Sequence, residues 1–264
     1  MNYNFKDKYT FDDLVEILRI LRRPGGCPWD REQTHESIRR NFIEETYEAI
    51  EAIDNKDSEL LCEELGDVML QVVFHAQISE DEGEFNINEV CDGVCKKLIV
   101  RHPHVFSDVL AETSEKVLEN WDKIKMQTKS QKTYTETLKS VSPALPALVR
   151  AEKVQHKAKK CGFDWDSVDG ALEKLSEEIG ELRNAIKEGN ADSAHEELGD
   201  VLFSAVSVSR FLDVDAEKAL SDSTVKFISR FEKIENLARE RNIDMKSASL
   251  SELDALWDEV KSNI

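Results

Sequence analysis

The most apolar segments of the chain, residues 68–78 and 201–212, each follow directly on an acidic block. Each segment is long enough to form a helix buried at the core of a bundle, and strand-like alternation of apolar and polar residues is scarce throughout. The chain has only 10 Gly and 5 Pro in 264 residues, which also favours helices. The pattern therefore predicts an all-α protein.

The acidic blocks occur twice with the same spacing. Residues 44–48 read Glu-Glu-Thr-Tyr-Glu and residues 63–67 read Glu-Glu-Leu-Gly-Asp, and 133 positions later the chain reads Glu-Glu-Ile-Gly-Glu and again Glu-Glu-Leu-Gly-Asp. An accidental charge run would not keep this register. Two copies of one unit explain it most simply.

Other blocks repeat as well, with small insertions or deletions between them. An aromatic-acidic loop (27–30 or 163–166) precedes the first acidic helix, and a turn (55–58 or 189–192) separates it from the second. Ser193 with Glu196, and Ser249 with Glu252, have the spacing of a capping box. Each pair predicts the start of a helix. Residues 140–146, Ser-Val-Ser-Pro-Ala-Leu-Pro, break the helical pattern and predict a linker, so we expect helical-bundle domains at 1–140 and 141–264.

The composition narrows the classes of partner. A formal net charge of −19 repels nucleic-acid backbones and anionic membranes, which argues against a nucleic-acid polymer as the main partner. No apolar run approaches the roughly 20 residues of a membrane span, and the polar N-terminus has no signal-peptide core. We therefore expect a cytoplasmic protein that does not enter membranes.

Within each acidic block, carboxylates three residues apart share one face of a helix. Glu45 pairs in this way with Glu48, and Glu64 with Asp67. Carboxylates held this close repel one another, so the site needs a cation to compensate. Carboxylate oxygens without nearby Cys or His ligands suit Mg²⁺ or Mn²⁺. Such a site points to phosphate ester or anhydride chemistry.

Three glycines of the acidic blocks support a functional interpretation. Gly66, Gly180 and Gly199 occupy helix positions where Gly costs on the order of 1 kcal/mol relative to Ala. Close approach of another helix or of a ligand would explain them.

The repeated Glu-Glu-x-x-Glu and Glu-x-x-Asp blocks resemble the signature of the MazG family of nucleoside triphosphate pyrophosphohydrolases. The segments Cys-Pro-Trp-Asp at 27–30 and Arg-His-Pro-His-Val-Phe at 101–106 are similar to motifs of that family's first domain. The resemblance runs from about Leu14 to Lys261 and includes the tandem plan.

This resemblance implies Mg²⁺-dependent hydrolysis of a nucleoside triphosphate, ATP included, between its α and β phosphates, with release of a monophosphate and pyrophosphate. It implies metal ligands in both copies, the second set also being the catalytic one: Glu45, Glu48, Glu64 and Asp67, and Glu178, Glu181, Glu197 and Asp200. Glu44 and Glu177, one residue earlier, would play supporting roles. The resemblance also implies a homodimer.

Basic and aromatic residues complete the predicted nucleotide site. Lys174, one turn before Glu178, is placed to contact phosphate, and tryptophans of the last helix of each copy are candidates for stacking on a base. The predicted nucleotide-binding residues are Lys174, Glu177, Lys226, Arg230, Trp257 and Lys261, with Lys97, Arg101, Trp121 and Lys125 as the first-copy counterparts. For His102 and His104 we expect a structural or phosphate-contact role, because the second copy lacks both.

The first copy has Asn41 where the second has Lys174, so we favour the C-terminal copy as the working one. Two alternatives stay open. One is a narrower pyrophosphohydrolase acting on dCTP, dUTP or phosphoribosyl-ATP, for which one domain normally suffices. The other is a non-catalytic scaffold or regulator whose acidic faces bind a basic partner.

Overall fold

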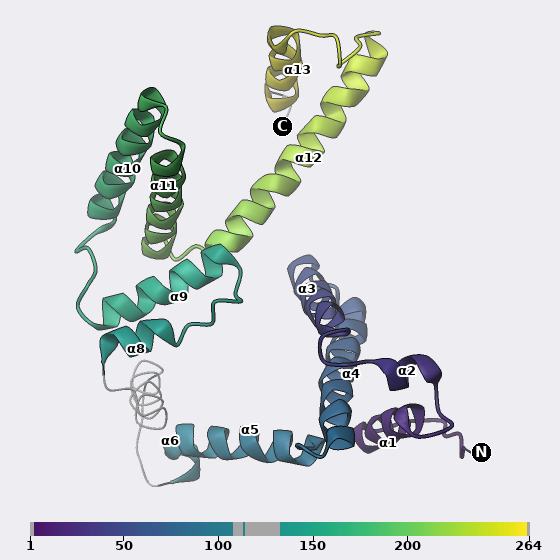
Figure 1. Ribbon diagram of the computed structural model, residues 1–264. Helices are drawn as coiled ribbons and strands as arrows, with labels where there is room; N and C mark the ends of the chain where they lie inside the picture. Colours follow the sequence, from purple (N-terminus) through teal and green to yellow (C-terminus); the bar gives the residue numbers. More distant parts are fainter. Residues whose placement is uncertain (1–2, 108–112, 114–132, 263–264) are drawn as a thin grey trace. The chain divides into compact units, whose positions relative to one another are not determined.

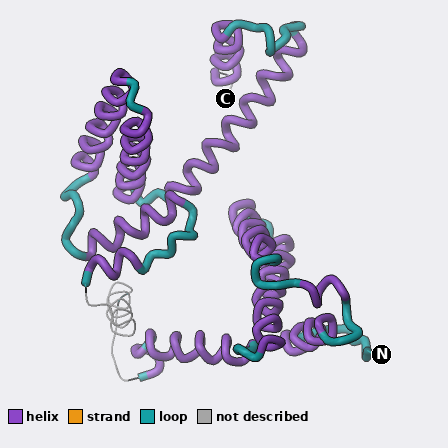
Figure 2. Tube along the Cα trace, in the orientation of Figure 1, coloured by secondary structure: helices purple, strands orange, loops and turns teal. Residues whose placement is uncertain are grey.

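The computed structural model describes residues 3–107, 113 and 133–262, and these are helical with connecting turns and loops and no strand (Figures 1 and 2). They divide into two compact units, Met1–Lys125 and Met126–Ile264. The all-α fold class is confirmed. The predicted domain boundary between residues 140 and 141 stays a prediction.

The first unit is built on a helical hairpin. Its helices are α1 (Phe11–Arg22), α2 (Pro28–Glu32), α3 (Arg39–Asn55), α4 (Ser58–Glu82), α5 (Ile87–Arg101) and α6 (Pro103–Phe106). Helix α3 ends where Lys56 takes a left-handed conformation with φ 57°, and Asp57 then caps α4 by accepting hydrogen bonds from two backbone N–H groups. This tight turn folds α4 back along α3.

The core of the first unit lies at the far half of α4. Helix α1 packs there, and its Leu18 is buried against Val73 and Phe74 of α4. The predicted buried helix at 68–78 is therefore confirmed for its second half, whereas Met69 in its first half is exposed.

The second unit repeats the hairpin. Its helices are α8 (Tyr134–Lys139), α9 (Ala147–Lys160), α10 (Val168–Glu188), α11 (Ala191–Phe211), α12 (Ala216–Glu240) and α13 (Leu250–Ser262). Gly189, with φ 69°, ends α10, and α11 packs along it. The non-helical stretch 140–146 separates α8 from α9, as its sequence predicts.

Helix α11 begins earlier than its sequence predicts. Asn190 is the N-cap and its side chain accepts a hydrogen bond from the N–H of Ser193 at 3.1 Å, so Ser193 lies inside the helix. The predicted capping box at Ser193 is therefore wrong, because Asn190 caps as well as Ser and directly follows the glycine that ends α10. The second predicted box is confirmed: Glu252 accepts a hydrogen bond from the N–H of Ser249, and Ser249 Oγ accepts one from the N–H of Glu252.

Two features of the hairpins bear on the site. The helical glycines Gly66, Gly180 and Gly199 face open space, since a Cβ atom added at any of them would meet no heavy atom of the described chain within 4 Å. Close approach of another helix within the described part of the chain therefore does not explain them. In addition, no described helix has the length and apolar character needed to cross a membrane.

Candidate functional site

The first carboxylate cluster lies between the paired helices α3 and α4. Glu45 and Glu48 project from one face of α3, and Glu64 lies opposite on α4. One oxygen atom from each of these three side chains lies within 4.8 Å of the others. Burial, then the charges of Asp67, Glu48 and Glu44, raise the pKa of Glu45, so Asp67 belongs to the same electrostatic group.

Glu64 is the most buried carboxylate of this cluster. Its side chain is buried, and the pKa of Glu64 is raised by desolvation and by the neighbouring carboxylates Glu48 and Asp67. Four acidic groups held this close oppose one another's ionisation. The fold therefore maintains a charge arrangement that a cation would stabilise.

The second cluster forms in the same way between α10 and α11. Glu178, Glu197 and Asp200 each place one oxygen atom within 4.8 Å of the others. Glu178 is only 5% exposed. Glu181 lies beside them: burial, then Glu178 and Glu197, raise the pKa of Glu181. Three of the four predicted metal-ligand positions of each copy thus lie together, and the fourth, Asp67 or Glu181, interacts electrostatically with them.

One lysine distinguishes the two clusters. Lys174 Nζ lies 2.8 Å from a carboxylate oxygen of Glu178 and 2.9 Å from one of Glu177, and these two contacts raise the pKa of Lys174. In the first copy, Asn41 stands at the equivalent position, and Arg40 instead forms an ion pair with Glu44, whose oxygen lies 2.8 Å from Nε. Among the residues that the structure describes, the second cluster therefore carries an internal counter-ion that the first lacks.

The donor set of each cluster fits a hard dication. It consists of carboxylate oxygens alone, part of them buried, which is the ligand chemistry that Mg²⁺ and Mn²⁺ prefer. Like charges held together in a partly buried set, such as that of the first cluster, oppose one another unless a cation is bound. Both clusters could hold one ion between the helices of the hairpin.

The other predicted nucleotide-binding residues of the second copy lie on α12 and α13. The guanidinium of Arg230 on α12 lies 5.8 Å from the centroid of the Trp257 ring on α13, and the Phe227 ring also packs on Trp257. Lys226 and Lys261 are exposed on the same two helices. The described contacts do not bring these four side chains to Glu178, so their part in nucleotide binding stays a prediction.

In the first unit, Lys97 and Arg101 lie on α5, whereas Trp121 and Lys125 fall outside the described residues. His102 follows α5 directly, and its Nδ1 lies 2.7 Å from the carbonyl oxygen of Leu98. This contact at the helix end fits a structural role for His102.

Sequence reasoning missed one group of potential ligands. His35, Glu82 and Glu84 meet at the end of α4, although 47 residues separate the histidine from the first glutamate. The sequence offers one sign of this group, because His35 has no histidine at the corresponding part of the second copy. Only the folded chain brings the three residues together.

Comparison with known proteins agrees with the two clusters. The family model described as the MazG nucleotide pyrophosphohydrolase domain matches twice, at residues 33–106 and 167–234, and each match contains one cluster. The chain is 44% identical to the nucleoside triphosphate pyrophosphohydrolase/pyrophosphatase MazG of Thermotoga maritima, with 95% of each chain covered.

Two further relatives match over nearly the whole chain. The nucleoside triphosphate pyrophosphohydrolase of Escherichia coli K12 is 40% identical over 95% of this chain and 96% of its own length. A Bacillus subtilis protein, the uncharacterized YabN, is 45% identical over 96% of this chain, which spans 52% of it. With a family match in each half and relatives this similar over nearly all of its length, the chain belongs to the MazG nucleotide pyrophosphohydrolase family.

Proposed function

We propose that this protein hydrolyses nucleoside triphosphates between the α and β phosphates, releasing a nucleoside monophosphate and pyrophosphate, with Mg²⁺ as its cofactor. The observation that carries the proposal is the convergence of carboxylates from two paired helices, repeated in both copies. Membership of the MazG family, and the printed names of the relatives from Thermotoga maritima and Escherichia coli, support the reaction class.

The carboxylates of the second cluster would bind the metal and accept a proton. Mg²⁺, when bound, would neutralise the triphosphate charge and polarise the phosphorus under attack. Glu178, Glu197 and Asp200 would hold it, with Glu181 beside them. A carboxylate of the cluster would accept the proton that the attacking water loses. Mn²⁺ would substitute, since it accepts the same oxygen ligands.

Lys174 gives the second cluster a positive charge that suits this reaction. Its ammonium already lies at the edge of the carboxylate group, 2.8 Å from Glu178, where the phosphates of a metal-bound nucleotide would approach. Asn41 offers the first cluster no such charge. We therefore propose the C-terminal cluster as the main catalytic centre.

Product analysis tests the reaction. The purified chain is incubated with each common NTP and dNTP and Mg²⁺, and pyrophosphate and orthophosphate are assayed separately, with and without EDTA. Pyrophosphate and monophosphate in equal amounts, lost with EDTA, are expected. Orthophosphate as the product, or turnover unaffected by EDTA, would overturn the proposal. The same panel separates a broad housekeeping activity on common and aberrant nucleotides from action on dCTP or dUTP alone.

We also propose that two copies of the chain associate. Leu65 and Met69 on α4, and the equivalent Leu198 and Leu202 on α11, are all about half exposed beside the carboxylates. Apolar side chains left exposed at matching positions of both copies indicate a surface that another helix covers. A second copy of the chain would supply such helices and could bring the basic residues of α12 and α13 to the clusters.

A scaffold protein would behave differently from the enzyme. An enzyme of this kind gains thermal stability when Mg²⁺ and nucleotide bind, because ligands that bind only the folded state shift the unfolding equilibrium. Replacing Glu178 by Ala should abolish that gain. If the replacement instead leaves the gain intact, the second cluster does not bind the metal–nucleotide complex.

A further inference from the structure

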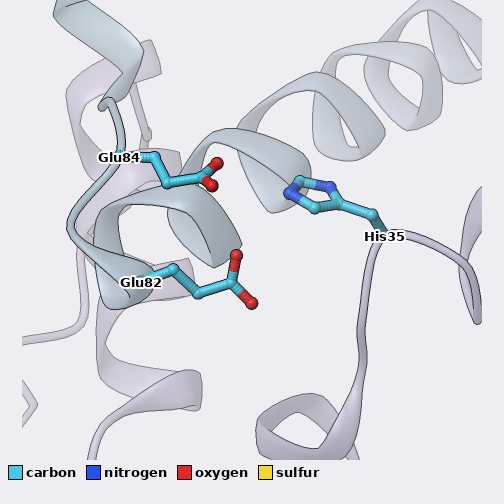
Figure 3. A group of neighbouring side chains, drawn as sticks. All are labelled: His35, Glu82 and Glu84. Carbon is cyan, nitrogen blue, oxygen red and sulfur yellow. The ribbon is translucent and has the colours of Figure 1, made fainter.

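A histidine and two glutamates meet at the end of α4, far from the first carboxylate cluster. Glu64 and Glu82 lie on the same helix, 18 residues apart, which at a rise of 1.5 Å per residue corresponds to about 27 Å. Ligand atoms of His35, Glu82 and Glu84 lie within 4.8 Å of one another (Figure 3). The proposed hydrolysis uses none of these three side chains.

The helix terminus explains why the two glutamates lie together. Glu82 is the last residue of α4, and Gly83 follows in the left-handed conformation with φ 76°. The N–H of Glu84 then donates a hydrogen bond to the carbonyl oxygen of Ser79 at 2.9 Å, so the chain folds back over the helix end. This turn places the Glu84 carboxylate next to that of Glu82.

Contacts inside the unit hold His35 over this turn. His35 Nδ1 lies 2.7 Å from Nδ1 of His75, and Nε2 lies 3.1 Å from the hydroxyl of the fully buried Ser79. A histidine that binds a metal through one nitrogen usually donates a hydrogen bond from the other, which fixes its tautomer. His75 is placed to accept that bond, which leaves Nε2 of His35 for a cation.

The neighbouring charges are already paired, but those of Glu82 and Glu84 are not. Arg19 pairs with Glu80 at 3.2 Å, and Arg22 pairs with Asp81 at 2.8 Å. Within the part of the chain that the structure describes, neither Glu82 nor Glu84 has an ion-pair partner. Two carboxylates and an imidazole thus converge on one point with a net negative charge.

We propose that His35, Glu82 and Glu84 bind one first-row dication of the Zn²⁺ or Mn²⁺ kind, with water at the remaining position. A mixed set of imidazole and carboxylates suits these ions better than Mg²⁺. Bonds of about 2.0–2.2 Å require ligand atoms roughly 3.4 Å apart. The two glutamates are exposed and can close that distance by rotating their side chains.

The role that follows is structural. The ion would fasten the loop before α3, which carries His35, to the end of α4, and so set the start of the helix that bears Glu45 and Glu48. It would displace the Ser79 hydroxyl from Nε2, and a helical serine can donate instead to the carbonyl four residues earlier. The site belongs to the first copy, since Val208 stands in the second copy where His75 stands in the first.

Zinc titration of the full chain tests the proposal. Glu45→Gln and Glu178→Gln are introduced first, so that the carboxylate clusters do not dominate, and Zn²⁺ binding to the metal-stripped protein is measured by isothermal titration calorimetry. We expect one equivalent to bind. Separate addition of His35→Ala or Glu84→Gln should weaken that binding at least about tenfold. Glu84→Gln serves as the second variant because it changes an exposed side chain with little risk to folding.

Glu80→Gln is the matched control. It removes one negative charge two residues from Glu82 but no proposed ligand, so it should leave the affinity within about twofold of the parent. Each variant is checked for an unchanged melting temperature in EDTA. Failure of the parent to bind Zn²⁺ or Mn²⁺, unchanged binding in His35→Ala, or equal weakening by Glu80→Gln would each overturn the site.

Discussion

At the scale of single residues, Lys174 separates the two copies more clearly than any carboxylate does. Its ammonium lies within 2.9 Å of both Glu177 and Glu178, whereas the first copy places the neutral Asn41 at that register. A resident ammonium competes with a metal for the same oxygen atoms, and it also supplies positive charge for phosphate. The two effects should be separable by experiment.

Replacing Lys174 by Ala should therefore tighten Mg²⁺ binding to the nucleotide-free protein, by about threefold for a partly screened charge, while weakening nucleotide binding. The reverse change, Asn41→Lys, should weaken Mg²⁺ binding to the first cluster. Calorimetric titration of Mg²⁺ into each variant measures both. Equal Mg²⁺ affinity with and without Lys174 would show that the lysine does not act as a counter-ion.

Asp164 carries a second prediction at this scale. Two hydrogen bonds from the nearly buried Arg210, one of them 2.8 Å long, lower the pKa of Asp164. A carboxyl group whose pKa is lowered by folding stabilises the folded state at pH values above the pKa of the unfolded chain, about 3.9. That stabilisation is lost as the pH falls through the pKa of the folded state. Asp164→Asn should thus cost about 3 kcal/mol at neutral pH.

Urea unfolding of both proteins at neutral pH and near pH 3 measures the difference. The difference in unfolding free energy should shrink at the acid pH, because there the unfolded chain takes up a proton at Asp164 that the folded chain, with its lowered pKa, resists. A difference of the same size at both values would mean that the ion pair is not the source of the stability.

At the scale of elements, the helical hairpin is the unit that the chain repeats, and its turn shows how far the sequence predicts it. The 133-residue register predicted both turns, and the structure has them at Lys56 and Gly189, both left-handed. The start of α11 was mispredicted because Asn190 and Ser193 are both good caps, and local spacing alone does not choose between them. In the structure Asn190, which directly follows the glycine that ends α10, is the cap.

The equivalent turn residues give a prediction for the hairpin. Lys56 adopts φ 57°, which costs a residue with a Cβ atom on the order of 1 kcal/mol, whereas Gly189 adopts φ 69° without that cost. Lys56→Gly should therefore raise the free energy of unfolding by about 0.5–1 kcal/mol, and Gly189→Lys should lower it by a similar amount. Chemical denaturation of the two variants is the measurement. Destabilisation by Lys56→Gly would mean that the lysine side chain makes a contact worth more than the strain.

At the scale of the whole molecule, the exposed apolar positions and the glycines facing open space indicate that the hairpins are incomplete by themselves. The sequence predicts the all-α tandem, because helical spacing and the repeat are local properties, and six of the eight carboxylates that it singles out lie in the two three-residue groups. Their role as metal ligands stays a prediction. It did not predict the group of His35, Glu82 and Glu84, whose members come together only through the packing of a loop on the end of α4.

Association of two chains makes a prediction at this scale. Replacing Leu198 and Leu202 by Glu should shift the protein from dimer to monomer in sedimentation-velocity experiments, because burying two charges at an apolar interface is costly. The exposed Leu250, 75% accessible on α13, provides a control position for the same substitution. A wild-type protein that sediments as a monomer at all concentrations would contradict the proposed association.

We propose that the second carboxylate cluster, with its lysine, catalyses the release of pyrophosphate. The most direct measurement is the rate of pyrophosphate release from ATP and dNTPs with Mg²⁺ by the wild type, Glu45→Gln and Glu178→Gln. We predict that Glu178→Gln lowers the rate at least about a hundredfold, while Glu45→Gln retains most of it. A Glu178→Gln variant that keeps wild-type activity would contradict the account.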